Sequence, residues 1–438
     1  AHTSLSGTGV SDYGDILLMP VVGQPVFDKN AYSSPFDKND ENAIAGYYSV
    51  RLQKYDVLAE LTATERVGYH RYSFPANAEA NIIIDLEHRD EVIESSIEFV
   101  SDTEIRGMRR STNWAKDMIW FFHIQFSKPF AKSGIALNDS LVEGMKKAEG
   151  RKLKAFVGFS TTDGETITAK VGLSAVDANG ALKNLQQEVA GKSFDEVKEA
   201  AAGSWKKILS AISVKGGTKE QLNVFYTALY HTMLQPNVFM DVDGRYRGND
   251  RQIHKADGFT NYTVFSLWDT YRAWHPLMTI IDQSRTNDFI RTMLEIYQQT
   301  GLLPIWELAG NETYCMIGNH SIPVITDAWM KGIRDFDAQA ALEAMLKSSE
   351  KDHFGLNVFR QFGYISGDKE HESVSKALEY GYNDWCVAAM AKDLGHHDIF
   401  NKYIETAQTY KNYFDPSTGF MRPRINGGWL NPFDPSTV

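Results

Sequence analysis

The sequence predicts a multidomain β + α protein, with an N-terminal antiparallel β-sandwich, a helical linker and then a mainly helical domain. Three observations support this fold class. The chain has 438 residues, more than one ordinary hydrophobic core accommodates. Its first part carries apolar residues at every second position, which is typical of strands with one buried face. After about Asp177 the apolar residues recur at helical spacing instead. We place the domains at residues 1–176, 177–217 and 218–438.

The β-sandwich is predicted from a series of strands with no helix between them. Within 47–74, Val50, Leu52 and Val57 alternate with charged and polar residues. A first short strand is expected at 15–20. Further candidate strands occupy 81–89, 95–111, 117–130, 153–161 and 165–176. Strands that follow one another without crossover helices pair antiparallel, most simply as a sandwich.

Helices are predicted for the linker and for the rest of the chain. In the linker, Leu182, Leu185 and Val189 share one face of the first of two helices. Beyond it, candidate helices occupy 218–234, 266–282, 285–300, 322–333, 337–352, 373–394 and 397–414. Helices alternating with long polar loops are typical of stacked helical hairpins in a bundle or toroid. These helices are too few to close a six-hairpin toroid, so a toroid would be incomplete here; a shorter helical domain is the alternative.

Composition and motifs exclude several classes of function. The net charge of −11 argues against nucleic acid as a partner, because phosphates require a basic surface. No run of 18 apolar residues predicts a membrane-spanning segment. The sequence contains no HExxH, P-loop lysine or GxSxG motif. Cys315 and Cys386 form no disulfide framework and are expected to be core thiols. Residues 241–250 lack the glycine and the closing glutamate of a calcium loop, so we expect a hairpin turn at Asp243 and Gly244.

Aromatic and polar residues are concentrated between Thr263 and Trp329. They are Trp268, Asp269, Tyr271, Arg272, Trp274, Trp306, Glu307, Asn311, Glu312, Asn319, His320, Asp327 and Trp329. A sugar ring offers an apolar face and a rim of hydroxyl groups, and this mixture of side chains suits both. An aromatic-rich helical core whose charges reach the surface is the alternative, although buried polar groups must then find partners.

Trp268 and Asp269 are expected in the first turn of a helix, where the helix dipole favours a carboxylate. Asp269 would accept hydrogen bonds from two adjacent sugar hydroxyls while Trp268 covers a ring face. Alternatively, Asp269 pairs with Arg272 or caps the helix. Glu312 and His320 are candidate substrate-binding residues in a loop, where binding sites are commonly carried. Glu312 is also the loop glutamate that could serve as a catalytic acid.

Two further segments carry residues that could be functional. Glu379, Tyr382 and Asp384 lie in the predicted helix 373–394, and we interpret them as structural. The glycine-rich segment 5–20 is either a turn before the first strand or a loop that lines a pocket.

Five motifs, in this order, resemble glycoside hydrolase family 92, the calcium-dependent exo-α-mannosidases that include α-1,2-mannosidases. They are LSGTGVSDYGDILLMP, SLWDTYRAWHPL, GNETYCMIGNHS, LEYGYNDWC and NPFDP, and they span nearly the whole chain. The resemblance implies a β-sandwich, a helical linker and an (α/α)6 toroid with the site between them. It further implies that terminal α-linked mannose is removed from glycans, N-glycans among them, with inversion of configuration. It also implies a bacterial enzyme that is secreted or periplasmic, with surface anchoring as a further alternative.

The resemblance also assigns individual residues. It implies that Trp268 and Asp269 hold the terminal mannose. It further implies that the SGTG loop, with Gly9, Val10 and Asp12, helps define the subsite for the leaving sugar.

The catalytic motifs that the resemblance implies are expected beyond Val438, the last residue of the sequence. The family's general acid, base and Ca²⁺ ligands lie in motifs after the FDP segment, and none of these occurs up to Val438. We therefore expect a chain that is the first part of a longer protein, or an inactive fragment. Another toroid glycosidase, an inverting disaccharide phosphorylase and a non-catalytic carbohydrate-binding protein are the alternatives.

Overall fold

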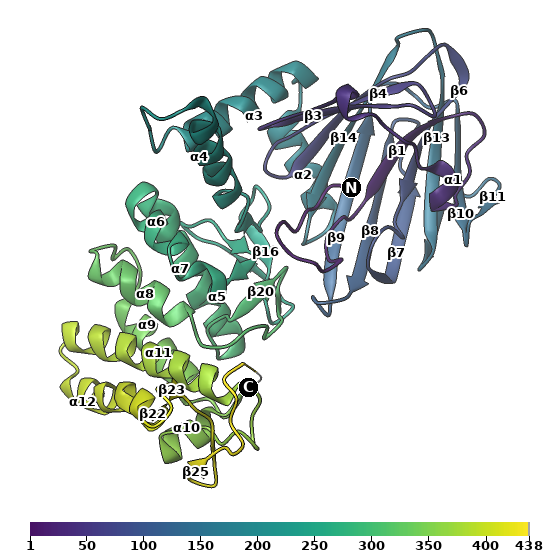
Figure 1. Cartoon of the computed structure of the whole chain (residues 1–438). Helices are drawn as coiled ribbons and strands as arrows, with labels where there is room; N and C mark the ends of the chain where they lie inside the picture. The colour runs from purple at the N-terminus through teal and green to yellow at the C-terminus, as the bar shows by residue number, and fades with distance from the viewer. Residues whose placement is uncertain (437–438) are drawn as a thin grey trace. The chain divides into compact units, whose positions relative to one another are not determined.

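The computed structural model describes residues 1–436, and the chain divides into two units (Figure 1). The first unit comprises residues 1–247 and 253–257. The second comprises residues 248–252 and the chain from Gly258 onward. Val438 lies outside the described residues. The predicted helical domain ends at this residue, and the catalytic motifs are expected beyond it. Both of these expectations therefore stay predictions.

The first unit is built on two antiparallel β-sheets (Figure 1). The smaller sheet has the strand order β1-β6-β13-β10-β11, and the larger has the order β12-β7-β8-β9-β14-β5-β4-β3-β2. The strands are β1 Leu17–Val22, β2 Glu41–Ile44, β3 Tyr47–Leu52, β4 Val57–Ala63, β5 Val67–Ser73, β6 Asn77–Asp85, β7 Glu91–Phe99, β8 Glu104–Thr112, β9 Met118–Phe126, β10 Lys132–Leu137, β11 Ser140–Val142, β12 Lys147–Gly150, β13 Leu153–Thr161 and β14 Thr166–Ser174. The predicted N-terminal antiparallel sheets are confirmed, although β1 begins at Leu17 rather than at Asp15.

The hydrophobic core of the first unit lies between the two sheets. Ile82 and Ile84 of β6 are fully buried, as are Phe122 and Ile124 of β9, and alternate residues of these strands therefore face inward. Phe126 of the larger sheet and Phe159 of the smaller one are in contact, with ring centroids 5.9 Å apart. Strand β8 of the larger sheet alternates between buried and partly exposed residues, as the sequence pattern predicted, whereas Ile83 is as buried as Ile82 and Ile84, so both faces of β6 are covered.

A buried ionic network holds the N-terminal segment against the larger sheet. The guanidinium of Arg109, on β8, pairs with the carboxylates of Asp15 and Asp90, and all three side chains are almost completely inaccessible to solvent. Arg109 also donates hydrogen bonds to the carbonyl oxygens of Leu86, at 2.9 Å, and His88, at 3.0 Å. The buried charges are therefore both paired and hydrogen-bonded, which their desolvation requires.

Helices follow the sheets within the first unit. They are α2 Ala178–Val189, α3 Phe194–Leu209 and α4 Lys219–Thr232, and they are preceded by α1 Lys29–Tyr32 and the 3-10 turn η1 Lys38–Asp40. Helix α2 packs on β14, where a Cβ atom at Gly172 would lie 2.2 Å from the carbonyl oxygen of Ala181. Three short strands complete the unit, β15 Asn237–Val238, β16 Arg245–Arg247 and β17 Ile253–Lys255, and β16 pairs with β17. The predicted turn at Gly244 is present, because its N–H donates to the carbonyl of Asp241.

The second unit is mainly helical, as predicted (Figure 1). Its helices are α5 Leu267–Thr270, α6 Trp274–Ile281, α7 Gln283–Thr300, α8 Ser321–Met330, α9 Ala338–Glu350, α10 Leu356–Phe362, α11 Ser373–Asp393, α12 His397–Thr406 and the 3-10 helix η2 Ala407–Asn412. Its strands are β18 Tyr262–Thr263, β19 Phe265–Ser266, β20 Trp306–Leu308, β21 Asn311–Glu312, β22 Phe414–Asp415, β23 Phe420–Met421, β24 Arg424–Ile425 and β25 Gly428–Trp429. The single helix predicted over 266–282 is wrong, because the chain breaks into α5 and α6. Helix α10 and the three-stranded sheet β19-β20-β21 were not predicted.

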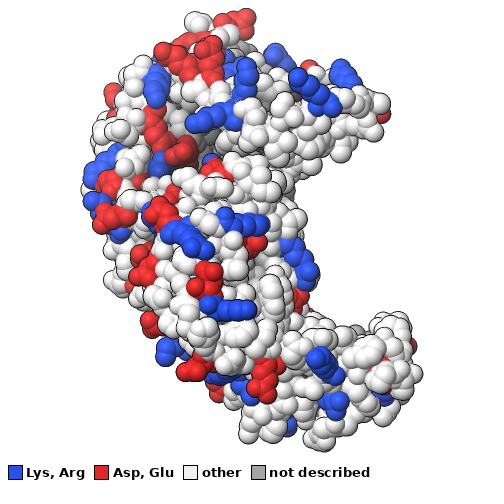
Figure 2. Space-filling view, turned by 90° about the vertical axis from the view of Figure 1, so that its left-hand side faces the viewer, with Lys and Arg blue, Asp and Glu red and all other residues white. Residues whose placement is uncertain are grey.

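Charged side chains are mixed over the face of the molecule shown in Figure 2, where acidic and basic residues lie interspersed. The net charge of −11 is therefore not gathered into one field on that face. Among the described residues, none of the helices has the length and apolar character needed to cross a membrane.

Candidate functional site

The candidate site begins at the short turn that carries Trp268 and Asp269. Leu267 is fully buried and anchors this turn, whereas Trp268 is 36% exposed and Asp269 is exposed beside it. The turn is closed by hydrogen bonds to Ser266 and Leu267: the Thr270 hydroxyl donates to the Ser266 carbonyl at 2.9 Å, and the Tyr271 N–H donates to the Leu267 carbonyl. Trp268 and Asp269 thus project together from a fixed backbone.

The Asp269 carboxylate accepts a hydrogen bond from the hydroxyl of Ser266. Within residues 1–436 no ion pair engages it, because Arg272 pairs with Glu379 instead. The alternative in which Asp269 pairs with Arg272 is therefore wrong. A carboxylate has about four acceptor positions, so Asp269 keeps capacity for further donors from solvent or a ligand.

A tight reversal at Ala273 separates this turn from helix α6. Ala273 has φ 61° and ψ −54°, and the N–H of Trp274 donates to the carbonyl of Arg272 at 2.7 Å. This geometry is a γ-turn with positive φ, which is rare and strained for a residue with a side chain. Because the chain reverses at Ala273, the aromatic residues on its two sides do not lie on the one continuous helix that their sequence spacing predicted.

The residues after the turn converge on Glu379 of helix α11. The Tyr271 hydroxyl donates to Glu379 Oε2 at 3.1 Å, and an Arg272 guanidinium nitrogen lies 3.6 Å from Oε1. His320 Nε2 lies 3.4 Å from Oε2. The Glu379 side chain is only 15% exposed and His320 is buried, whereas the Arg272 side chain is 71% exposed, so the cluster reaches from the interior to the surface. We call Tyr271, Arg272, His320, Glu379 and Asn383 the Glu379 cluster.

His320 is held in one orientation within this cluster. Its ring stacks on Tyr271 with centroids 3.9 Å apart and planes 2° apart, and Asn383 Nδ2 lies 3.5 Å from its Nδ1. Burial, with a contribution from the Arg272 charge, lowers the pKa of His320 to about 3, so the ring is neutral at pH 7. An Nδ1 that accepts from Asn383 leaves the proton on Nε2, which is buried and makes no hydrogen bond.

Gly318 makes room for that ring. Its φ is +81°, and a Cβ atom there would lie 2.3 Å from His320 Nε2. Both the backbone conformation and the space therefore require glycine at this position.

Glu312, a predicted substrate-binding residue, has its carboxylate engaged by backbone N–H groups. It lies in strand β21, and its carboxylate accepts hydrogen bonds from the N–H groups of Ile305, Trp306 and Tyr314, all between 2.8 and 2.9 Å. These bonds use the carboxylate to hold the 305–314 segment together. They support a structural role for Glu312, and its roles in substrate binding and as an acid stay predictions.

Glu307, on the neighbouring strand β20, is a buried carboxyl group whose importance the sequence did not reveal. It is 1% exposed and accepts hydrogen bonds from the Thr263 hydroxyl, Val264 N–H and Gly310 N–H. Burial raises its pKa to about 8 despite these donors. It ties β19 and β20 together immediately before the turn that carries Trp268.

The N-terminal loop belongs to the first unit. Gly9 is exposed and Val10 is half-buried, so both can meet solvent or a ligand. Asp12 is 1% exposed, and its carboxylate accepts from Asn113 Nδ2 at 2.7 Å and from the N–H of Ala115 at 2.8 Å. Asp12 thus anchors the loop to the β8–β9 connection, and its contact with sugar stays a prediction.

The structural interpretation of Glu379, Tyr382 and Asp384 on helix α11 stays a prediction. Asp384 is fully buried and pairs with Arg360, whereas Glu379 is the centre of the cluster. The four-residue spacing of Glu379 and Asn383, which places both on one helix face, was the signal available in the sequence.

The two cysteines differ in burial. Cys386 is buried, as predicted, but Cys315 is only half-buried, so its interpretation as a core thiol is corrected. Burial, together with the charge of Asp269, raises the pKa of the Cys315 thiol.

A calcium site is not formed by the described residues. Among residues 1–436, no group of three or more His, Cys, Asp or Glu side chains could hold a metal ion. Calcium takes six to eight oxygen ligands, usually with several carboxylates among them. The described side chains therefore do not fit the calcium ion that the resemblance implies.

Comparison with known proteins decides the family. A model described as the glycosyl hydrolase family 92 N-terminal domain matches residues 1–174, and one described as the family 92 catalytic domain matches residues 180–438. The chain belongs to glycosyl hydrolase family 92.

Several relatives resemble this family 92 chain over nearly its whole length. A family GH92 α-mannosidase from Bacteroides thetaiotaomicron, solved in complex with mannoimidazole, is 37% identical, with a TM-score of 0.95 over 99% of this chain and 59% of its own. A family GH92 inverting mannosidase from Bacteroides thetaiotaomicron VPI-5482 is 30% identical, with a TM-score of 0.89 over 95% and 58%. An uncharacterized secreted glycosidase of Arthroderma benhamiae is 26% identical over 98% of this chain and 59% of its own length. The family 92 chain thus spans about three fifths of the length of these relatives.

Proposed function

We propose that the protein containing this chain is an exo-acting, inverting α-mannosidase that hydrolyses terminal α-linked mannose from glycans. The observation that carries the proposal is that Trp268 and Asp269, consecutive residues on a fixed turn, are both exposed and that the Asp269 carboxylate keeps free acceptor positions. An aromatic face next to a carboxylate matches a sugar ring, which has an apolar face and adjacent hydroxyl donors. The relatives described as α-mannosidase and inverting mannosidase support mannose as that sugar.

In this proposal the residues of the chain bind and orient the sugar. Asp269 accepts hydrogen bonds from two adjacent hydroxyls, and Trp268 covers one face of the ring. The neutral Nε2–H of His320 and the Glu379 carboxylate supply a donor and an acceptor in one cluster behind Tyr271. A ring held at several points loses freedom before the reaction, which lowers the barrier to attack.

Inversion requires a protonated carboxyl group at the leaving oxygen and a carboxylate that activates water on the opposite face, about 6.5–9.5 Å apart. We assign neither role to a described residue, because Glu312 and Glu307 both use their carboxyl groups to hold the backbone. The motifs expected beyond Val438 are the proposed source of both groups.

Calcium assistance is a separate part of the proposal, for which the described side chains offer no set of ligands. A secreted or periplasmic location is likewise proposed, with support from the relative described as a secreted glycosidase.

Replacing Asp269 tests the proposal in the protein expressed at its full gene length. We expect Asp269→Ala to abolish mannose release from α-mannobiose while the circular dichroism spectrum and melting temperature stay unchanged. Asp352→Asn, an exposed position after helix α9, is the matched control and should keep full activity.

The configuration of the product tests the mechanism. Proton NMR of the wild-type reaction should show β-mannose first, as inversion requires. Near-normal turnover by Asp269→Ala would remove this residue from the site. Formation of mannose 1-phosphate in phosphate buffer would instead identify a phosphorylase.

A further inference from the structure

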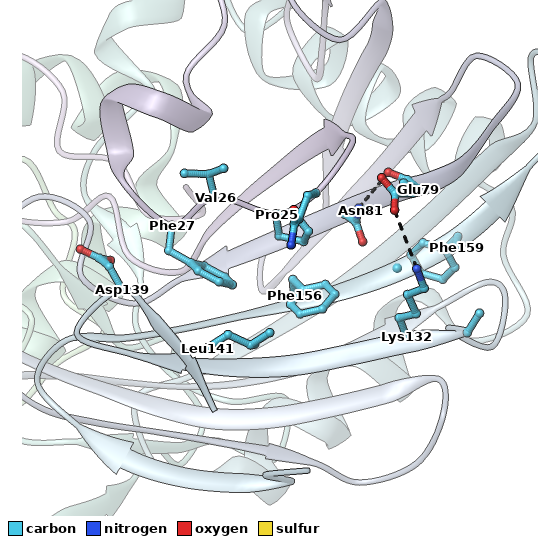
Figure 3. A pocket seen from close by; sticks show the side chains of 13 residues that line it. Pro25, Val26, Phe27, Glu79, Asn81, Lys132, Asp139, Leu141, Phe156 and Phe159 are labelled. Atoms are coloured by element: carbon cyan, nitrogen blue, oxygen red, sulfur yellow. Dashed lines mark hydrogen bonds and ion pairs between the residues drawn. The ribbon is translucent and has the colours of Figure 1, made fainter. Parts of the chain in front are cut away.

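The first unit contains a cavity of about 540 Å³ against the smaller β-sheet (Figure 3). Its size lies within the range of small-molecule binding pockets. The segment 24–27 forms one side, and strands β6, β10 and β13 contribute most of the rest. In Figure 3 the side chains of Phe27, Phe156 and Leu141 form an apolar part of the wall, and Asn81 and Lys132 lie on the polar part.

Asn81 presents an unused hydrogen-bond acceptor to this cavity. It is 3% exposed, and its Nδ2 donates to the carbonyl oxygens of Gly23 at 2.9 Å and Glu79 at 2.8 Å. Because both partners are acceptors, the amide nitrogen must face them and Oδ1 must face the other way. Among the described residues none donates a hydrogen bond to Oδ1. Asn81 lines the cavity, so a buried and oriented acceptor is available to a ligand there.

The apolar wall is rigid and the mouth is open. The Phe27 and Phe156 rings pack with centroids 6.2 Å apart, and both residues are buried. Gly158 keeps space beside the amide, since a Cβ atom there would lie 2.5 Å from Asn81 Oδ1. Val26 and Leu141 are each 50% exposed and lie at the entrance.

The charges around the cavity are paired. Lys132 Nζ lies 3.9 Å from a Glu79 carboxylate oxygen, and Lys154 Nζ donates to Asp139 at 2.5 Å. A pocket with compensated charges gives little attraction to an ion of either sign. An apolar wall, an acceptor that requires a donor, and balanced charges together favour a neutral polyhydroxyl ligand with one apolar face.

We propose that this cavity binds a pyranose unit of a neutral glycan, as an ancillary carbohydrate site in the first unit. One sugar hydroxyl donates to Asn81 Oδ1, and an apolar face of the ring packs on Phe156. The site would keep the enzyme on a polymer while terminal residues are removed elsewhere. The choice of a mannan as the ligand rests on the proposed function, whereas the site itself rests on the cavity.

Affinity electrophoresis of the whole 438-residue chain in native gels containing soluble α-mannan tests the proposal. The Asp269→Ala background removes binding at the proposed primary site. In that background, Leu141→Trp or Val26→Trp fills the entrance without disturbing a buried residue. Val100→Trp, which changes an exposed valine just after strand β7 of the other sheet, is the matched control. Circular dichroism of each variant verifies its fold.

We expect the Asp269→Ala chain to remain retarded by mannan, and each entrance variant to weaken its apparent affinity at least about tenfold. The control should migrate like its parent. Loss of all retardation in Asp269→Ala alone, or unchanged retardation in both folded entrance variants, would overturn the ancillary site. Neither result bears on the proposed function, whose failure appears as continued mannose release by the full-length Asp269→Ala enzyme.

Discussion

The buried carboxyl group of Glu307 makes the free energy of unfolding depend on pH. Its pKa is raised from 4.5 to about 8, so the folded protein keeps a proton that the unfolded chain releases above about pH 4.5. Folding is then favoured most below pH 4.5, and the contribution declines as the pH rises toward 8. The slope in this window is about 1.4 kcal/mol per pH unit for a single group.

We therefore expect Glu307→Gln to flatten the loss of stability between about pH 5 and pH 8, because a neutral amide replaces the protonated acid. Urea denaturation of the whole chain across this range measures the effect. Glu405→Gln, at an exposed position of helix α12, is the control and should preserve the wild-type slope. If the free energy of unfolding depends on pH in the same way for the wild type and for Glu307→Gln, Glu307 is not protonated in the folded protein.

Gly318 gives a second residue-scale prediction. Gly318→Ala must accept a positive φ and also displace the His320 ring. Gly332→Ala has the same conformational cost, since φ there is +84°, but meets no atom within 4 Å. Both should lose about 1–2 kcal/mol from the backbone. Gly318→Ala should lose a further ~1–3 kcal/mol from overpacking. Equal losses in urea denaturation would show that the ring moves freely.

At the scale of elements, the Arg109 network decides whether the N-terminal segment stays attached to the larger sheet. Arg109→Met leaves the buried carboxylates of Asp15 and Asp90 without a counter-charge. We expect a loss of about 3–5 kcal/mol in the free energy of unfolding, measured by urea denaturation. Arg51→Met is the control, because its pair with Asp56 is exposed and should contribute less than about 1 kcal/mol. A similar small loss at both positions would refute the structural role of the network.

The γ-turn at Ala273 explains why one predicted helix is two. Alanine is a strong helix former, and the aromatic spacing continues across it, so no local signal marked the break. Ala273→Gly should keep or raise stability by up to about 1 kcal/mol, because glycine accepts positive φ. Ala273→Val should destabilise the chain by ~2 kcal/mol or more, since a β-branched residue fits that conformation poorly. Thermal denaturation of both variants checks this order; a more stable valine variant would argue against the turn.

Other elements show which features a sequence can predict. Strands such as β8 were predictable because they bury one face, which leaves a period of two in the sequence, and β6 and β13, buried on both faces, show instead as short apolar runs. The strands β19, β20 and β21 have two or three residues each, too few to show a period. Likewise, Trp268 and Asp269 could be singled out by type, but the partners of Asp12 and Glu312 depend on distant backbone groups that only the folded chain brings near.

For the whole molecule, the two kinds of domain were predictable from the change in periodicity, whereas closure of the helices into a toroid stays a prediction. The chain spans about three fifths of the length of its family 92 relatives. A property of the complete enzyme can therefore depend on residues that this chain does not share. The catalytic acid and base expected beyond Val438 are such residues, and their positions stay a prediction. Calcium binding by this chain is a property that can be measured directly.

The last prediction concerns that metal. Since no cluster of three or more candidate ligand side chains occurs in residues 1–436, this chain should bind calcium weakly at most. A ligand that binds the folded state raises the melting temperature in proportion to its affinity and concentration. We expect millimolar CaCl₂ or EDTA to shift the melting temperature of the 438-residue chain by less than about 1 °C in calorimetry.

In contrast, EDTA should abolish mannose release by the full-length enzyme if its activity depends on calcium. A saturable, calcium-dependent rise in the melting temperature of this chain would mean that backbone carbonyls or isolated carboxylates complete a site here. The calcium ion would then bind to residues of this chain. The proposal that the calcium ligands lie outside the described residues would be wrong.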